Sequence, residues 1–176
     1  MRIFIHTMYY LPEFGSAPIL MNELATQLAR NGHAVEIVTT LPRPPHNKGY
    51  EGRFYVRETR TGFLVKRILT NFTRHHFGRL IAWSIYTLYT MVHLAKVRRG
   101  DVVFLRLPPL QLGVTGILAR FLRGARVMLN VQDIHPDLSI ESGILRNRVA
   151  IRFAQGLEKW VYRNSDHIVV ISDGFL

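Results

Sequence analysis

The chain contains no cysteine in its 176 residues, which excludes disulfide bonds and thiolate metal sites and leaves the redox compartment open. Its eight histidines are scattered and show no HExxH spacing, the pattern that places two zinc ligands on one helix. No basic segment with a cleavage site precedes the first apolar stretch, so a signal peptide is not predicted. A cytoplasmic location is therefore the default expectation.

Acidic residues are scarce: 12 Asp and Glu stand against 23 Lys and Arg, a formal net charge of +11. Between Glu58 and Asp133 the only acid is Asp101. Such an imbalance favours an anionic partner, which can be nucleic acid, acidic lipid headgroups or a phosphorylated substrate. Nucleic acid is the weakest of the three, because no known reading motif is present.

The first thirty-nine residues have the pattern of a strand, a helix and a second strand. Residues 2–7 are short and apolar, as in a strand buried in a parallel sheet, and residues 33–39 repeat that pattern. Between them, a stripe of leucines four residues apart predicts a helix that ends at Asn31 and Gly32: Leu20, Leu24 and Leu28. Ser16 is expected to cap this helix, with Pro18 in its first turn.

The loop that connects this first strand and helix carries Gly15 but no GxGxxG dinucleotide fingerprint. Ligands of open parallel sheets lie beyond the carboxyl ends of the strands, and backbone N–H groups at a helix start attract anions. Gly15 therefore has two interpretations, a residue that only permits a turn or part of an anion site.

Strands and helices alternate along the rest of the chain. Strands are predicted at residues 53–58, 62–68, 101–107, 126–131 and 167–171, and helices at 75–98, 111–122 and 146–164, with a loop over 41–52. The alternation predicts an α/β fold with a doubly wound parallel sheet and right-handed crossovers.

Two of the predicted helices carry mixed faces. In the helix over 75–98, aliphatic residues at helical spacing are expected to face the sheet: Phe77, Leu80, Ile81, Ile85, Leu88, Met91, Val92 and Ala95. Its other side carries aromatic and basic residues: Arg79, Trp83, Tyr86, Tyr89, Lys96, Arg98 and Arg99. These residues either pack on a neighbouring helix or contact an anionic membrane surface, since aromatic and basic side chains favour the headgroup region.

The helix over 146–164 is expected to turn one apolar face inward: Val149, Phe153, Leu157, Trp160 and Val161. Its other face is a basic stripe, interpreted first as a solvated surface: Arg148, Arg152, Lys159 and Arg163.

Several segments together resemble one family, the retaining glycosyltransferases of family four, in the branch that builds capsule, O-antigen and exopolysaccharide. The matching segments are residues 9–18, 31–35, 107–110, 131–137 and 157–172, and they cover nearly the whole chain in the family's order. The resemblance implies the Rossmann-like N-terminal half of a GT-B fold, which mainly receives the acceptor. The C-terminal donor-binding domain has no counterpart in residues 1–176, so these residues are expected to form a single domain that is inactive alone.

The resemblance also implies roles for particular residues. Asp133 and His135 would face the sugar and the acceptor hydroxyl, where a carboxylate polarises the hydroxyl or steadies positive charge; alternatively, Asp133 only caps a turn. Substrate-binding roles fall on Glu13, Gly15, Ser16, Arg106 and Pro108. The donor would be a nucleotide-diphosphate sugar, the acceptor polyprenyl-linked or a saccharide, and no bound metal or other cofactor is implied.

The implied enzyme would work in the cytoplasm, as a peripheral protein at the inner face of the cell membrane. The alternative hypothesis is a basic α/β module that binds an anionic membrane or another anionic partner and performs no chemistry.

Overall fold

The computed structural model describes residues 1–70, 76–132 and 147–170. Within these residues, seven strands form one sheet in the order β3-β4-β2-β1-β5-β6-β7. The strands are β1 (Arg2–His6), β2 (Ala34–Thr40), β3 (Tyr55–Arg60), β4 (Phe63–Ile68), β5 (Val102–Leu107), β6 (Arg126–Val131) and β7 (His167–Val170). The helices are α1 (Ser16–Arg30), α2 (His76–His93), the short 3-10 helix η1 (Leu94–Lys96), α3 (Gln111–Arg123) and α5 (Arg148–Asn164).

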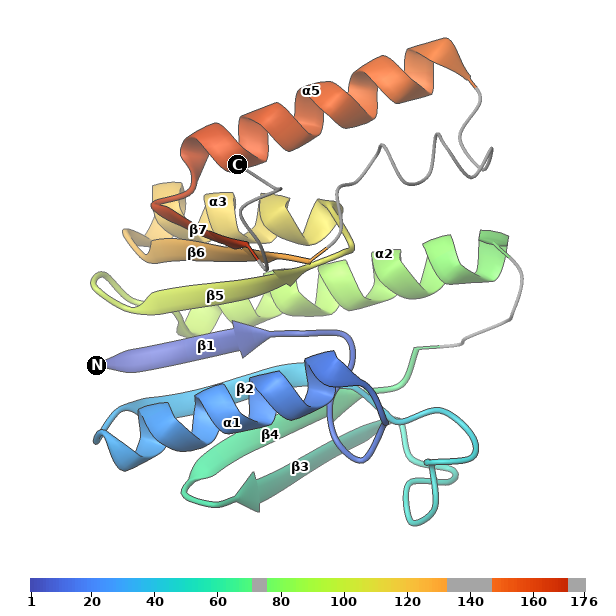
Figure 1. Cartoon of the computed structure of the whole chain (residues 1–176), viewed down its shortest axis with the longest axis vertical. Helices are drawn as coiled ribbons and strands as arrows, with labels where there is room; N and C mark the ends of the chain where they lie inside the picture. The colour runs from blue at the N-terminus through green and yellow to red at the C-terminus, as the bar shows by residue number, and fades with distance from the viewer. Residues whose placement is uncertain (71–75, 133–146, 171–176) are drawn as a thin grey trace.

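The sheet is parallel except at one edge, where β3 pairs antiparallel with β4. Strand β1 lies in the middle, with Ile5 opposite both Ile37 of β2 and Phe104 of β5. Helix α1 lies in front of the sheet in Figure 1, and α2 and α3 lie behind it, with α5 packed beside α3. The predicted doubly wound, Rossmann-like α/β architecture is confirmed.

Alternation along the strands divides the core between the two faces of the sheet. Ile3 and Ile5 of β1 belong to the cluster under α1, whereas Phe4 belongs to the cluster under α2 and α3. Because both faces of the central strands are covered, these strands read as continuous apolar runs.

Helix α2 is rotated relative to the prediction. Tyr86, expected to point outward, is 0% exposed, whereas Leu88 and Val92, expected to face the sheet, are 62% and 73% exposed. Trp83 and Tyr89 are partly buried and pack against the core. The prediction that the aromatic residues form the outer face is therefore wrong. No helix among the described residues is long and apolar enough to span a membrane.

The charged residues of the sheet explain this rotation. Glu36 of β2 and Lys66 of β4 form an ion pair beneath α2, and His93 Nδ1 of α2 lies 3.2 Å from a Glu36 carboxylate oxygen. The Tyr86 hydroxyl donates to the carbonyl oxygen of Val38 at 2.7 Å. A sheet surface with buried polar groups needs hydrogen-bonding partners, which an aliphatic helix face does not supply.

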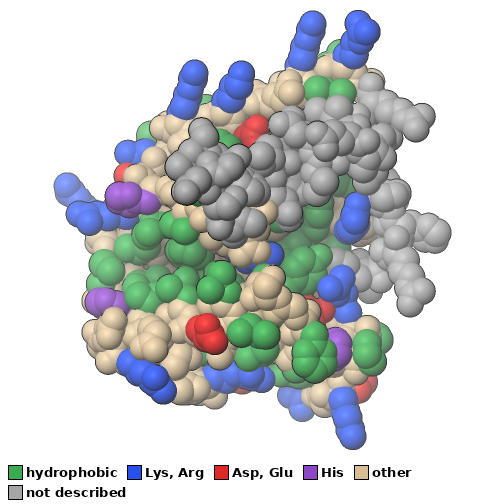
Figure 2. All heavy atoms as spheres, in the orientation of Figure 1, with side chains coloured by type: hydrophobic (Ala, Val, Ile, Leu, Met, Phe, Trp, Pro, Cys, Tyr) green, Lys and Arg blue, Asp and Glu red, His purple; other side chains and the backbone are tan. Residues whose placement is uncertain are grey.

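Two other predicted helix faces also differ from the structure. In α5, Val149 and Phe153 are 76% and 73% exposed and Trp160 is exposed as well; Val161 is buried and Leu157 packs against the core. In α1, Leu20 is exposed and the buried side chains are Ala17, Pro18, Met21 and Ala25. The buried strip is therefore shorter in α5 and shifted in α1, where Leu24 and Leu28 still pack against the core. Figure 2 shows the basic side chains of α5 projecting into solvent.

Candidate active site

The loop between β1 and α1 lies at the carboxyl edge of the sheet and is held by the neighbouring strands. The Thr40 hydroxyl of β2 donates to the carbonyl oxygen of Met8 at 2.7 Å. The guanidinium of Arg67, a fully buried side chain at the end of β4, donates to the carbonyl oxygen of Leu11. These bonds tie two backbone carbonyl oxygens of the loop to β2 and β4. The loop is therefore a fixed part of the sheet edge.

Glu13, predicted to bind substrate, lies in a cavity of about 190 Å³ at this edge. Its carboxylate is buried and accepts from the Arg43 Nε at 2.8 Å. The Arg43 guanidinium also lies over the ring of Tyr9, 4.6 Å from the ring centre. Burial disfavours the charge of Arg43, but the hydrogen bond and charge of Glu13 prevail and raise its pKa. Glu13 thus fixes a cation at the cavity.

Gly15 and Ser16 line the same cavity, where α1 begins. Gly15 has φ 139°, a conformation that L side chains rarely adopt, and it precedes the first helical residue. Ser16 is exposed and makes no capping hydrogen bond, so its predicted capping role is wrong. The first turn of α1 contains no acidic residue, so its N–H groups keep the positive end of the helix dipole uncompensated.

Arg106 and Pro108 lie at the carboxyl end of the neighbouring strand β5. Arg106 is buried, and its Nη2 donates to the side-chain oxygen of Gln132 at 2.7 Å. Gln132 in turn donates to the side-chain oxygen of Asn130 at 3.1 Å. The ends of β5 and β6 therefore share a polar network. Arg106 and Pro108 do not line the cavity that contains Glu13 and Gly15.

The predicted catalytic residues Asp133 and His135 lie outside the described residues. They follow Gln132 directly in the sequence, after the last residue of the polar network. In the described part of the chain, no three His, Asp or Glu side chains gather as a metal site would require.

Arg43 is the residue of this edge that sequence reasoning missed. It falls in a segment rich in Pro, Gly and Asn, which reads only as a loop. The one sequence feature that could have pointed to Arg43 is its position just after β2, whose carboxyl end lies at the same edge of the sheet as the loop with Glu13. Thirty residues separate it from Glu13 in the sequence, so no local pattern pairs them.

Comparison with known protein families identifies the family of the chain that carries this polar edge. Residues 17–176 match the sequence profile of the glycosyl transferase 4-like domain. The chain belongs to this family. The match begins inside α1, so β1 and the loop with Glu13, Gly15 and Ser16 precede the matched region.

One relative supports the same general activity. Over 85 residues, the glycosyl transferase 4-like domain is 32% identical to the "Probable glycosyltransferase WbjE" of Pseudomonas aeruginosa. The alignment covers 48% of this chain and 21% of the relative. The chain therefore spans about a fifth of the length of the relative that it matches. A role in glycosyl transfer follows from the family, and the details of the reaction do not.

Proposed function

We propose that this domain is the acceptor-binding, N-terminal half of a retaining GT-B glycosyltransferase. The enzyme moves a sugar from a nucleotide-diphosphate donor to a polyprenyl-linked or saccharide acceptor in the synthesis of a surface polysaccharide. It works in the cytoplasm at the inner face of the cell membrane, with a C-terminal donor domain outside residues 1–176. The observation that carries the proposal is the family match over residues 17–176, combined with a polar carboxyl edge.

The geometry of the cavity that contains Glu13 and Gly15 supports a contact with the diphosphate of the sugar donor. The start of α1 offers unpaired N–H groups, and Gly15 keeps the approach free of a side chain. Arg43 lines the same cavity and brings a guanidinium group that the buried Glu13 carboxylate holds in place. In this proposal Glu13, Ser16, Arg106 and Pro108 contribute to substrate binding, and Gln132 holds Arg106 at the edge of the sheet.

The proposed chemistry assigns Asp133 to the acceptor hydroxyl or to the developing charge at the anomeric carbon, and His135 to the same region. Replacing Asp133 with Asn in the complete enzyme is expected to lower turnover on the order of a hundredfold, the loss typical of a positioned acid–base group. An unchanged turnover would return Asp133 to the role of a turn cap. No resident metal or other cofactor takes part in this proposal.

The test compares the 176-residue chain with the gene product that contains it. Both are incubated with a panel of nucleotide sugars and a polyprenyl-diphosphate acceptor, and products are identified by mass spectrometry. Transfer by the longer protein alone is expected, because catalysis needs donor and acceptor held together. Transfer by residues 1–176 alone would contradict the division into halves, and no transfer by either protein would favour the non-catalytic module.

A further inference from the structure

The outer face of α2 is an aliphatic surface that the rotation of the helix exposes. Residues at helical spacing along this face are exposed: Leu80, Ile81, Leu88, Val92 and, in η1, Ala95. Apolar residues that gather on one exposed face, unlike scattered ones, indicate an interaction surface. The solvent-facing side of α2 is thus largely aliphatic, with Ser84 as an exposed polar residue within it.

Basic side chains flank this face at both ends. Arg79 is exposed near the start of α2, and Lys96, Arg98 and Arg99 are exposed just beyond its end. Residues 76–100 contain no acid, and the next one, Asp101, is buried and paired with Arg2. The aliphatic face therefore lies between positive charges that no acidic residue of its own segment offsets.

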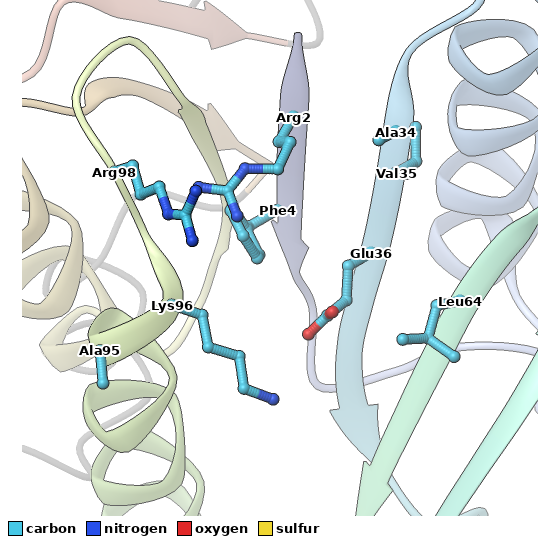
Figure 3. Close-up of a pocket in the computed structure, with 9 residues that line it drawn as sticks. All are labelled: Arg2, Phe4, Ala34, Val35, Glu36, Leu64, Ala95, Lys96 and Arg98. Carbon is cyan, nitrogen blue, oxygen red and sulfur yellow. The ribbon is translucent and has the colours of Figure 1, made fainter.

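A basic cavity continues the face at its carboxyl end. Figure 3 shows this cavity, of about 520 Å³, with Lys96 extended toward Glu36 and Arg98 close to Arg2. Ala95 and Lys96 belong both to the cavity and to η1, the short helix that follows α2, where both are exposed. The cavity lies at the amino ends of β1 and β2, away from the carboxyl edge with Glu13.

The charges around this cavity do not balance. Four cations, Arg2, Lys66, Lys96 and Arg98, lie in or beside this cavity with two carboxylates, those of Glu36 and Asp101, which leaves an excess of two positive charges among these six groups. Lys66 shows the effect: burial and the adjacent Lys96 lower its pKa, although Glu36 acts in the opposite direction. An anion at Lys96 and Arg98 would relieve this repulsion.

We propose that the outer face of α2 and the basic cavity at its end dock this domain on an anionic lipid bilayer, with lipid phosphates at Lys96 and Arg98. A bilayer offers apolar chains and phosphates in one surface, which matches an aliphatic row flanked by cations. Nucleic acid fits less well, because proteins stack its bases on aromatic side chains and the aromatic side of α2 packs against the core. The proposal rests on and deepens the proposed function, since docking would hold the domain at the bilayer that carries a lipid-linked acceptor.

The experiment measures co-sedimentation of the purified 176-residue chain with vesicles. Phosphatidylglycerol vesicles should bind it at low salt, phosphatidylcholine vesicles should bind it at least about tenfold more weakly, and binding should fall as salt rises. Glycerol phosphate in solution is added as a competitor. Loss of vesicle binding at millimolar competitor would point to a site for free phosphate instead, and would overturn the bilayer as the occupant.

Matched variants separate α2 from the rest of the basic surface. Leu88→Ser with Val92→Ser, and Lys96→Glu with Arg98→Glu, should each weaken vesicle binding about tenfold or more. The controls make the same changes on α5: Val149→Ser with Phe153→Ser, and Arg148→Glu with Arg152→Glu. The control pairs share the exposure and the change in net charge, so they should bind like the original chain.

Equal binding by the α2 variants and the original chain would overturn the proposal, as would equal losses from the α2 and α5 variants. A self-association of the chain that the Leu88 and Val92 changes abolish, without vesicle binding, would assign the face to a second copy and also overturn it. Far-UV circular dichroism confirms that each variant is folded. Sugar transfer by the longer protein to a detergent-dispersed acceptor is measured in parallel, so that failure to dock and failure of the transferase function are distinguished.

Discussion

Arg43 and Glu13 join two loops of the carboxyl edge through a contact of 2.8 Å between Nε and a carboxylate oxygen. The backbone N–H of Arg43 also donates to the same oxygen, at 3.3 Å. The carboxylate is buried whereas the guanidinium is about half exposed. The pair therefore helps to fix the shape of the cavity beside Gly15 and holds the Arg43 guanidinium in its lining.

Removing Arg43 should cost stability because it leaves the Glu13 carboxylate buried without its charged partner. Arg43→Ala is expected to lower the free energy of unfolding by about 1–2 kcal/mol, measured by urea denaturation. Arg30→Ala, at an exposed position, should change it by less than about 0.5 kcal/mol. Adding Glu13→Gln to Arg43→Ala should recover part of the loss. A double variant that is simply additive would show that the two side chains are not coupled.

His6 should make stability depend on pH. Burial, with the nearby charge of His93, lowers the pKa of His6 from 6.5 to about 3, while Glu36 acts in the opposite direction. Between these values the unfolded chain binds a proton that the folded ring does not. The contribution of His6 is thus complete above pH 6.5 and is lost as the pH falls toward 3.

Replacing His6 with Leu should flatten this dependence. Between pH 6.5 and 5 the variant is expected to lose less stability than the original chain, by up to about 1.4 kcal/mol per pH unit. Titration of the folded Glu36 carboxyl does not contribute between pH 6.5 and 5. Burial raises the pKa of Glu36, but the hydrogen bonds from His93 and Lys66 outweigh burial and lower the pKa to about 2. His167→Leu, at an exposed position, is the control. Equal slopes for both variants would refute the assignment.

Tyr86 should contribute to stability and not to membrane binding. Its hydroxyl donates to the Val38 carbonyl oxygen, and burial raises its pKa well above 10, so the donor stays protonated. Tyr86→Phe is expected to lower the free energy of unfolding by about 1 kcal/mol, since Val38 still accepts from the Thr7 N–H. Vesicle binding should be unchanged. A loss of vesicle binding at full stability would place the hydroxyl at the surface.

Gly116 of α3 should tolerate an added side chain poorly. A Cβ there would lie 2.3 Å from a methyl carbon of Leu105 and 3.0 Å from one of Val127. Gly116→Ala is expected to destabilise the fold by about 1–3 kcal/mol. Gly156→Ala in α5 is the matched control, because no atom lies within 4 Å of its new Cβ. It should stabilise the protein by up to about 1 kcal/mol, as alanine favours a helix. Thermal unfolding of both variants tests the contrast.

The alternation of strands and helices could be predicted from the sequence because it depends on local periodicity. Residues 126–131 and 167–171 are apolar runs bounded by turn signals, and the observed strands follow them closely. The position of Gly15 between a strand and a helix is local in the same sense, since both neighbours lie within ten residues. These features, together with the order of the family's motifs, were determined by the sequence alone.

Only the tertiary structure decided which side of α2 faces inward. Its sequence offers two candidate faces, one aliphatic and one with Trp83, Tyr86 and Tyr89, and periodicity ranks the aliphatic one first. The sheet beneath α2 carries the ion pair of Glu36 and Lys66, which come from β2 and β4. Because buried charges need hydrogen-bonding partners, the face with Tyr86 turned inward and the aliphatic face was left in solvent.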